Sequence, residues 1–448
     1  MSQDMNLIAA VDIGSAKVAA AVGRKHPDGQ VEVLGLESVK CDGMKRGVVF
    51  NVEEIVNAVR MVVSSLEQRL NIKLIDVFVS VSGFNVRATE NSCYRFIRED
   101  ELIKSFDLEQ LLQDSYRIVL QPDEKILHVV PQDYAVDHER GVKKPIGYSG
   151  QRLEGNFHVI IGMHSDVRKI EKCIEKAGLR LNGLVFTSLA SAEAVLSDEE
   201  KEAGVVMVDI GAGTTDLALF QDGVLRYSAV IPFGGNVVTN DIKEGCGVLQ
   251  KHAEKMKTQF GSAMGTMARE DAVVTIPGIS GWEPKEIAFK SLACIIQARM
   301  EEIIELIMHH IERSGYFEKL GAGIVFTGGG AMLKHLSDLT KLKTGFDVRI
   351  GSVSRAFSSE EEQLLKVPSY STAAGLLISA GKYPGSRITR EQELFEDVEK
   401  EEQPVSKSDR KKKNVSKNKK PKRDKLEYIT GDLFSRLAGM FEEKDTEM

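Results

Sequence analysis

Two stretches of this chain combine a carboxylate, a glycine turn and hydroxyl or amino groups between two apolar runs. Residues 8–22 read IAAVDIGSAKVAAAV and residues 205–220 read VVMVDIGAGTTDLALF. Asp12 and Gly14 in the first align with Asp209 and Gly211 in the second at one common offset. Two apolar runs joined by a glycine turn predict a β-hairpin. The repetition predicts two related α/β lobes, each opening with this hairpin.

Each turn carries groups that bind phosphate. Glycine lets backbone N–H groups approach an anion closely, and nearby hydroxyl and ammonium groups add to the binding. The first turn offers Gly14, Ser15, Ala16 and Lys17, and the second offers Gly211, Gly213, Thr214, Thr215 and Asp216. Asp12 and Asp209 each precede such a turn, which suits contact with a Mg²⁺ ion that keeps several waters. We therefore expect phosphate and Mg²⁺ at these turns.

The spacing excludes two common phosphate motifs. Neither turn has the G-x-x-x-x-G-K-[ST] spacing of a Walker loop. The second turn runs into the strand-like Leu217–Phe220, whereas a dinucleotide fingerprint opens a helix. A third cluster of Gly328, Gly329 and Gly330 follows a strand, leads into a helix, and would let a flat base lie against the backbone. Each feature alone could be a tight turn, but their joint presence favours a ligand site.

At these residues the chain resembles the actin/Hsp70/sugar-kinase superfamily, and within it most closely the FtsA family of bacterial cell-division proteins. The two hairpins are similar to the superfamily's phosphate motifs, and residues 326–330 are similar to its adenosine motif. Three further stretches resemble the family: GNVVTNDI at 235–242, AEKMK at 253–257 and ARMEE at 298–302. The resemblance covers nearly all of residues 6–385.

The resemblance implies an α/β, actin-like two-lobed ATPase fold with duplicated RNase H-like lobes that hold ATP and Mg²⁺. It adds Gly235, Asn236, Glu254 and Lys257 to the nucleotide-binding residues. It also implies self-assembly into filaments, and it makes Arg299 the position that receives the acidic tail of the tubulin-like protein FtsZ. From its spacing alone, Arg299 is better explained as a solvated helix residue.

Catalysis is a separate question. Some superfamily members place an acid or amide before the helix at 190–196 to handle the attacking water. Residues 186–191 read FTSLAS and contain neither. We therefore expect ATP binding with at most weak hydrolysis, and the sequence identifies no catalytic residue.

The domain organisation follows from these features. The predicted first-lobe core is 1–83 and 165–204, with a small α+β subdomain inserted at 84–164 that holds a helix around 108–119. The predicted second-lobe core is 205–245 and 302–390, with an outer part at 246–301. The resemblance implies that the inserted subdomain binds other division proteins.

The composition changes near residue 391. Residues 391–404 hold seven acids and one Lys, and residues 405–425 hold eleven Lys or Arg and two Asp. So few apolar side chains cannot offset the entropy of ordering, which predicts a disordered charged linker over 391–427. The basic part is as well explained by a solvated spacer as by contact with lipid.

Residues 428–443 turn apolar again at helical spacing. The apolar positions are Ile429, Leu433, Phe434, Leu437, Met440 and Phe441. Such a helix is too short to span a bilayer and is suited to lie in the interface of an anionic membrane. It could instead dock on the protein's own body or on a partner, but the linker favours the membrane.

Composition narrows the classes of function. The 448 residues carry a net charge of −7, which argues against a nucleic-acid binder. The five cysteines form neither a disulfide framework nor a zinc pattern, so a reducing cytoplasm is expected. The resemblance implies a division protein that tethers FtsZ filaments to the cytoplasmic face of the cell membrane at the septum and recruits later divisome proteins.

Two alternatives share the fold. A small-molecule kinase would need a general base that we cannot place, and it has no evident use for the tail. An Hsp70-like chaperone would need a β-rich client domain, which about 60 mostly polar residues cannot build.

Overall fold

A computed structural model describes residues 7–26, 30–98, 102–277, 283–353, 362–380 and 382. By the contacts between its residues, the chain divides into two units, 1–390 and 391–448, and every described residue belongs to the first. The linker and amphipathic helix predicted for 391–443 thus lie outside the described residues. Within the described ranges, none of the helices has the length and apolar character needed to cross a bilayer.

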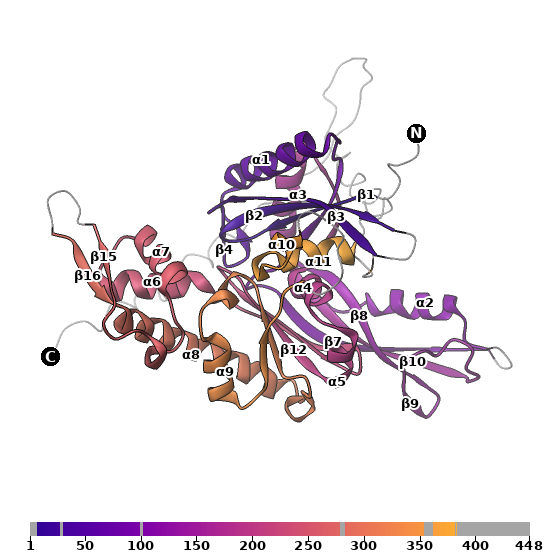
Figure 1. Ribbon diagram of the computed structural model, residues 1–448. Helices are drawn as coiled ribbons and strands as arrows, with labels where there is room; N and C mark the ends of the chain where they lie inside the picture. Colours follow the sequence, from indigo (N-terminus) through magenta and orange to yellow (C-terminus); the bar gives the residue numbers. More distant parts are fainter. Residues whose placement is uncertain are drawn as a thin grey trace, which may run out of the picture. The chain divides into compact units, whose positions relative to one another are not determined.

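Two five-stranded sheets repeat one topology (Figure 1). The first has the order β3 (Val31–Lys40), β2 (Lys17–Lys25), β1 (Leu7–Ile13), β6 (Asp76–Val81) and β11 (Arg180–Phe186). The second has the order β14 (Val224–Ile231), β13 (Thr215–Gln221), β12 (Val205–Ile210), β17 (Ile324–Thr327) and β18 (Val348–Ile350). In each, three antiparallel strands are followed by two that run parallel to the first strand of the sheet. The two predicted hairpins, β1–β2 and β12–β13, are therefore confirmed as equivalent elements of duplicated lobes.

Helices fill three layers around these sheets. Helices α4 (Thr187–Val195) and α11 (Ser371–Ser379) pack on each other and lie between the sheets. Helices α1 (Val52–Leu70) and α3 (His164–Lys176) cover the first sheet from outside, whereas α6 (Gly235–Cys246), α8 (Phe289–Arg313) and α9 (Leu336–Thr344) lie on the second lobe's outer side. The contact of α4 with α11 is close because Gly375 has no side chain: a Cβ there would lie 1.8 Å from the carbonyl oxygen of Ala190.

Strand β12 explains how the layers are held together. Its alternate side chains point to opposite faces, as in any strand. Val205 and Met207 join the core that contains α4, α11 and the first sheet. Val206, Val208 and Ile210 join the core under α8 and α9. The apolar run at 205–208 thus forms a strand that is buried on both faces.

The remaining elements are short. They are β4 (Met44–Lys45), β5 (Val48–Val49), α5 (Asp198–Ala203), α7 (Gln250–Phe260), β15 (Val273–Ile276), β16 (Lys285–Ala288) and α10 (Glu362–Leu365), with 3-10 turns at Gly265–Met267, Phe317–Lys319, Gly329–Met332 and Pro368–Tyr370.

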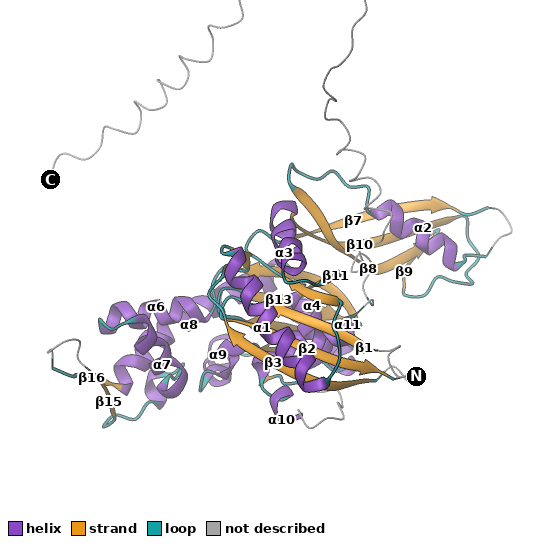
Figure 2. Ribbon diagram, turned by 90° about the horizontal axis from the view of Figure 1, so that it is seen from above, coloured by secondary structure: helices purple, strands orange, loops and turns teal. Residues whose placement is uncertain are grey.

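The inserted segment has a sheet and a core of its own. Its sheet has the order β7 (Arg87–Phe96), β10 (Arg152–Met163), β8 (Glu124–Val136) and β9 (Glu139–Val142), and α2 (Ser105–Ser115) lies along one face (Figure 2). Leu111 of α2 packs with Leu153 and Phe157 of β10. The helix was expected around 108–119 but begins earlier, because the Asp107 carboxylate accepts a hydrogen bond from the backbone N–H of Lys104 and caps it there.

Candidate nucleotide site

The first turn places a carboxylate and an ammonium group side by side. Asp12 is the last residue but one of β1, and its Oδ1 accepts a hydrogen bond from Ser80 Oγ of β6 at 2.8 Å. Lys17 Nζ donates to Ser369 Oγ at 3.1 Å and lies 3.4 Å from the ring centroid of Tyr370. Burial raises the pKa of Asp12 and lowers the pKa of Lys17 to about 8, although the charges of Asp12 and Asp209 oppose the shift of the lysine.

The second turn holds two buried carboxylates. Asp209 Oδ2 accepts hydrogen bonds from Ser191 Oγ of α4 at 2.6 Å and from Thr372 Oγ1 of α11 at 3.2 Å. Asp216 accepts one from Thr214 Oγ1 at 2.9 Å. Burial, together with repulsion between the carboxylates, raises the pKa of Asp209 to about 6 and that of Asp216 to about 7. Asp216 is therefore the carboxylate best matched to exchange a proton near neutral pH.

The two turns have the same closure and lie against each other. The N–H of Gly14 donates to the Lys17 carbonyl at 3.0 Å, and the N–H of Gly211 donates to the Thr214 carbonyl at 2.9 Å. Gly213 lies so near the first turn that a Cβ would be 2.5 Å from Ser15 Oγ. A further link joins the lobes where the Ser82 hydroxyl, at the end of the first lobe's β6, donates to Asp216. Turns that lie far apart in sequence thus form one polar cluster.

The third glycine cluster, residues 328–330, lies in close contact with the second turn. Gly328 has φ = 84°, and a Cβ there would lie 2.2 Å from Asp209 Oδ1, so both the backbone and the space require glycine. Gly330 lies against the Ile210 side chain, whereas a Cβ on Gly329 would meet nothing nearer than 3.9 Å. The helix expected after this cluster is confirmed. The chain first forms a 3-10 turn at Gly329–Met332, and α9 begins after His335, which adopts a left-handed conformation.

Helices α6 and α7 attach to the same turn. The N–H groups of Gly235 and Asn236, which open α6, donate to the carbonyls of Gly211 (2.9 Å) and Ala212 (2.8 Å). Lys257 Nζ of α7 donates to the Gly235 carbonyl at 2.9 Å and forms an ion pair with Glu254 at 2.8 Å. Gly235 and Asn236 thus contact the second turn directly, whereas Lys257 and Glu254 are linked to it through Gly235.

Matches to known proteins agree with this geometry. Residues 206–375 match the model of the family described as "Cell division protein FtsA", and residues 83–161 match "SHS2 domain inserted in FTSA". The cell division protein FtsA of Pseudomonas aeruginosa is 34% identical over 376 residues, which cover 84% of this chain and 89% of that protein. The cell division protein FtsA of Escherichia coli K12 is 35% identical over 382 residues, covering 84% and 90%. The chain belongs to the FtsA family.

Membership makes this chain a cell-division protein with an actin-like fold, as predicted. A solved structure described as "PilM-PilN type IV pilus biogenesis complex" aligns with 83% of this chain and 97% of its own length, at a TM-score of 0.59 and 16% identity. This likeness concerns the fold alone.

Arg299 lies on α8. Its guanidinium forms a two-pronged ion pair with Asp241 of α6, with Nε 2.6 Å from Oδ2 and Nη2 3.0 Å from Oδ1. Nη1 donates to Glu302 at 2.5 Å. Arg299 is thus a paired helix residue in this structure, and any acidic ligand would have to compete with Asp241.

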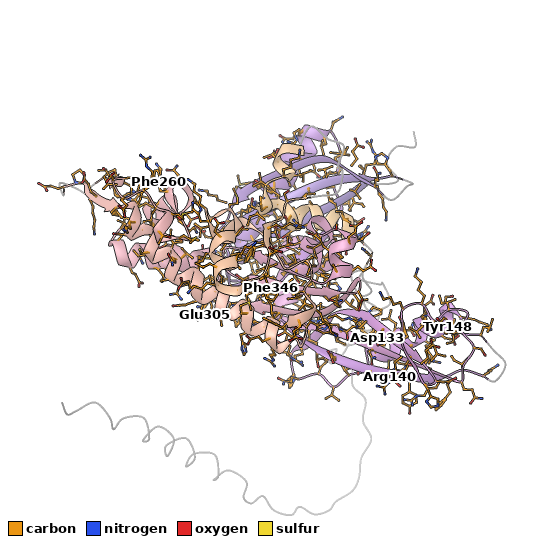
Figure 3. The ribbon with its side chains drawn as sticks, turned by 60° about the horizontal axis from the view of Figure 1, so that its bottom comes forward. Asp133, Arg140, Tyr148, Phe260, Glu305 and Phe346 are labelled. Carbon is orange, nitrogen blue, oxygen red and sulfur yellow. The ribbon has the colours of Figure 1, made fainter. Side chains whose placement is uncertain are left out.

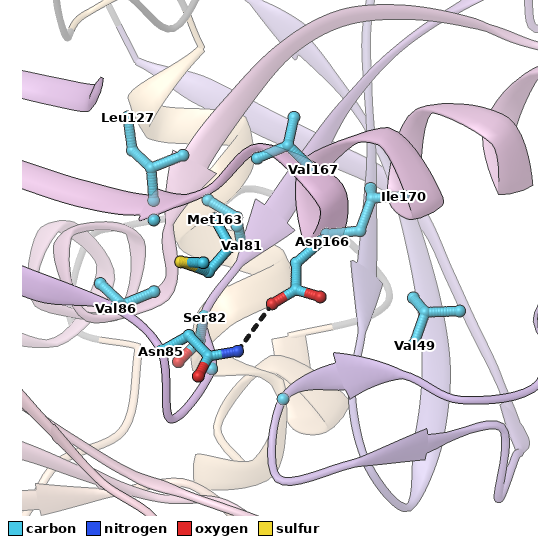
Figure 4. Close-up of a pocket in the computed structure, with 13 residues that line it drawn as sticks. Val49, Val81, Ser82, Asn85, Val86, Leu127, Met163, Asp166, Val167 and Ile170 are labelled. Carbon is cyan, nitrogen blue, oxygen red and sulfur yellow. Dashed lines mark hydrogen bonds between the residues drawn. The ribbon is translucent and has the colours of Figure 1, made fainter. Parts of the chain in front are cut away.

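A small cavity lies near the root of the insert (Figure 4). It encloses about 10 Å³ between the end of β6 and α3, and Asn85 Nδ2 donates to Asp166 Oδ2 across it at 2.9 Å. That volume holds about one water, and none of the predicted nucleotide-binding residues lines it.

The structure adds residues that sequence reasoning missed. Ser80, Ser191 and Thr372 orient the carboxylates of Asp12 and Asp209, while Ser369 and Tyr370 hold Lys17. Single hydroxyl residues in ordinary strands and helices carry no signal in one sequence. Among the described residues, no three His, Cys, Asp or Glu side chains are grouped as a metal site, so the pair Asp12 and Asp209 stays a prediction.

Proposed function

We propose that this chain binds ATP with Mg²⁺ between its two lobes and links FtsZ filaments to the cytoplasmic face of the cell membrane at the division septum. The observation that carries the nucleotide part is the contact of the two turns, in which Gly213 faces Ser15 and Lys17 lies within the field of both Asp12 and Asp209. A cluster of buried carboxylates beside one lysine and glycine turns has the chemistry to hold a polyphosphate with a divalent cation.

The residues have distinct parts in this proposal. The glycine turns with Ser15, Lys17, Thr214 and Thr215 bind phosphates. Asp12 and Asp209 hold Mg²⁺, which neutralises phosphate charge; their raised pKa values reflect buried negative charge that a divalent cation would relieve. The adenosine lies against Gly328, Gly329 and Gly330, near Glu254 and Lys257. Asp216 belongs with the nucleotide-binding residues and is held by hydrogen bonds from Ser82 and Thr214.

The partner site is proposed at Arg299. An acidic FtsZ tail would bind the guanidinium fork in place of Asp241, because carboxylates pair with Arg in the same geometry. Asp241→Asn should then tighten the binding of an FtsZ C-terminal peptide, and Arg299→Ala should abolish it. Fluorescence anisotropy of a labelled peptide measures both. Unchanged affinity in both variants would remove this site.

The membrane part rests on the sequence of residues 428–443. Partial burial of a few apolar side chains gives modest affinity per molecule, and linking many copies in a filament raises avidity. We propose that self-assembly and membrane residence reinforce each other, and that residues 84–164 recruit later division proteins.

Vesicle co-sedimentation tests the tether. The full chain should carry FtsZ down with anionic vesicles, and Leu437→Glu should release both. Ser435→Glu adds the same charge on the polar side of the predicted helix and serves as the control. Equal sedimentation of the full chain and Leu437→Glu would show that this helix is not the anchor.

A further inference from the structure

The face of the insert's sheet opposite α2 rests on the second lobe. Strands β7, β8 and β10 of the insert all contact β14, the edge strand of the second sheet. Figure 3 labels Asp133, Arg140 and Tyr148 on the insert and Glu305 and Phe346 on the second lobe. The chain connects the insert only to the first lobe, through β6 and α3. The contact with β14 therefore bridges the two lobes.

Polar groups make this contact. Asp133 Oδ2 pairs with Arg226 Nη1 at 2.9 Å, and Gln132 Nε2 donates to the carbonyls of Leu225 and Arg226, both at 3.1 Å. His158 Nε2 and Ser228 Oγ are 2.8 Å apart, and both side chains are buried. These hydrogen bonds and this ion pair make the interface specific in geometry.

Some buried polar groups in this interface lack hydrogen bonds to the part of the protein that the structure describes. Among the described residues, none forms a hydrogen bond with the buried Arg226 Nε or His158 Nδ1. Each buried polar group left unpaired costs free energy that water would repay if the surfaces separated. An interface of this kind is suited to two states, docked and released.

The β13–β14 hairpin connects this interface to the nucleotide cluster. β13 begins at Thr215 in the second turn, and Asp216 is its second residue. In the ladder, Asp216 is opposite Val230, and Ala218 is opposite Ser228. One end of the hairpin therefore carries the carboxylate that binds Ser82 of the first lobe, and the same hairpin carries the Ser228 and Arg226 held by the insert.

We propose that the β13–β14 hairpin couples nucleotide binding to docking of the insert, so that the docked insert favours the closed arrangement of the two turns. This coupling rests on the proposed nucleotide site. Because coupling between sites is reciprocal, whatever releases the insert weakens nucleotide binding by the factor by which nucleotide strengthens docking. The orientation of the insert would thereby report the nucleotide state to partners.

The test measures docking and affinity in the same full-length protein. Spin labels at Val119→Cys on the insert and Leu342→Cys on α9 occupy exposed positions, and Cys294→Ser removes an exposed native thiol. Asp133→Arg should broaden the distance between the labels and weaken ATP binding about fivefold or more. Asp133→Arg combined with Arg226→Asp restores the pair with reversed charges and should recover both values.

Glu109→Arg is the matched control, since Glu109 is exposed on α2 and makes the same change of charge on the insert. Gln132→Leu, which removes the two hydrogen bonds to β14, provides a second variant if Asp133→Arg unfolds by circular dichroism. If Asp133→Arg or Gln132→Leu leaves the distances and the affinity as in Glu109→Arg, the coupling is wrong while the nucleotide site stands. If the parent chain binds no ATP, the proposed function fails and the coupling with it; the distances then still report docking by itself.

Discussion

The two glycine turns that we propose bind phosphate share one backbone conformation and differ in charge. Both are closed by the same N–H to carbonyl bond from their first glycine. At equivalent positions, the first turn has Lys17 where the second has Thr214, and Ala19 where the second has Asp216. The first turn thus combines the carboxylate of Asp12 with the ammonium group of Lys17. The second turn has two buried carboxylates, Asp209 and Asp216, which accept hydrogen bonds from hydroxyl groups. The two copies of a duplicated hairpin can therefore keep one backbone geometry while their side chains carry different charges.

Removing the positive charge of Lys17 should have the largest effect on nucleotide binding. Lys17→Met should weaken ATP binding by roughly 10–100-fold, because a charge-assisted hydrogen bond is worth about 1.5–3 kcal/mol. Thr214→Val, the equivalent change in the second turn, removes a neutral donor and should cost about tenfold or less. Calorimetric titration measures the ATP affinity of both variants. Equal losses of affinity would show that the two turns do not differ in their contribution to ATP binding.

A glycine comparison tests the contact between the turns. Gly213→Ala places a Cβ against Ser15 and the Arg46 backbone, and overpacking of this kind costs about 1–3 kcal/mol of unfolding free energy. Gly329→Ala, whose Cβ would have only ordinary contacts, should leave stability nearly unchanged. Urea unfolding of both variants measures the difference, and a harmless Gly213→Ala would mean that the turns do not touch.

Acidity separates the second turn from the first. Asp216 has a folded pKa of about 7, above the value near 3.9 expected for an unfolded chain. The folded state therefore holds a proton that the unfolded state loses, so this stabilisation is complete below pH 4 and is lost as pH rises through 7. Asp216→Asn should remove that loss and gain roughly 2–3 kcal/mol relative to the parent between pH 5 and 8.

Thermal unfolding across this range measures the effect, and Asp222→Asn, at the exposed tip of the same hairpin, is the control. Parallel pH profiles for parent and Asp216→Asn would contradict the assignment.

The smallest difference in unfolding free energy should be between variants that lack one hydroxyl donor to Asp12 or to Asp209. Ser80→Ala removes the hydroxyl that binds Asp12, at a cost of about 1–3 kcal/mol for a buried acceptor left unpaired. Ser191→Ala leaves Asp209 with Thr372 and should cost about 0.5–1.5 kcal/mol. Guanidinium unfolding of both variants measures these costs. A larger cost for Ser191→Ala than for Ser80→Ala would show that Thr372 does not support Asp209.

The hairpins could be predicted because their signal is local. Asp-Ile-Gly between apolar runs predicts a strand, a turn and a second strand within about fifteen residues, and the structure confirms this twice. The partners of the carboxylates could not be predicted, because Ser80, Ser191 and Thr372 come from separate elements brought together by packing. The pairing of Arg299 with Asp241 was likewise invisible, since it depends on how α6 lies against α8.

The start of one helix could not be predicted, for a local reason. The α2 helix begins at a capping interaction of Asp107 that the apolar spacing does not reveal. The helix expected after the third glycine cluster is present as α9, and it begins only after the left-handed His335. Apolar periodicity locates the buried face of a helix better than its ends.

Calorimetric titration of the full chain with ATP in the presence of Mg²⁺ tests the central claim most directly. The account predicts one saturable site per chain, with heat that disappears in Asp12→Asn combined with Asp209→Asn while the fold remains intact by circular dichroism. Titration of the folded parent without any binding heat, at several temperatures, would contradict it.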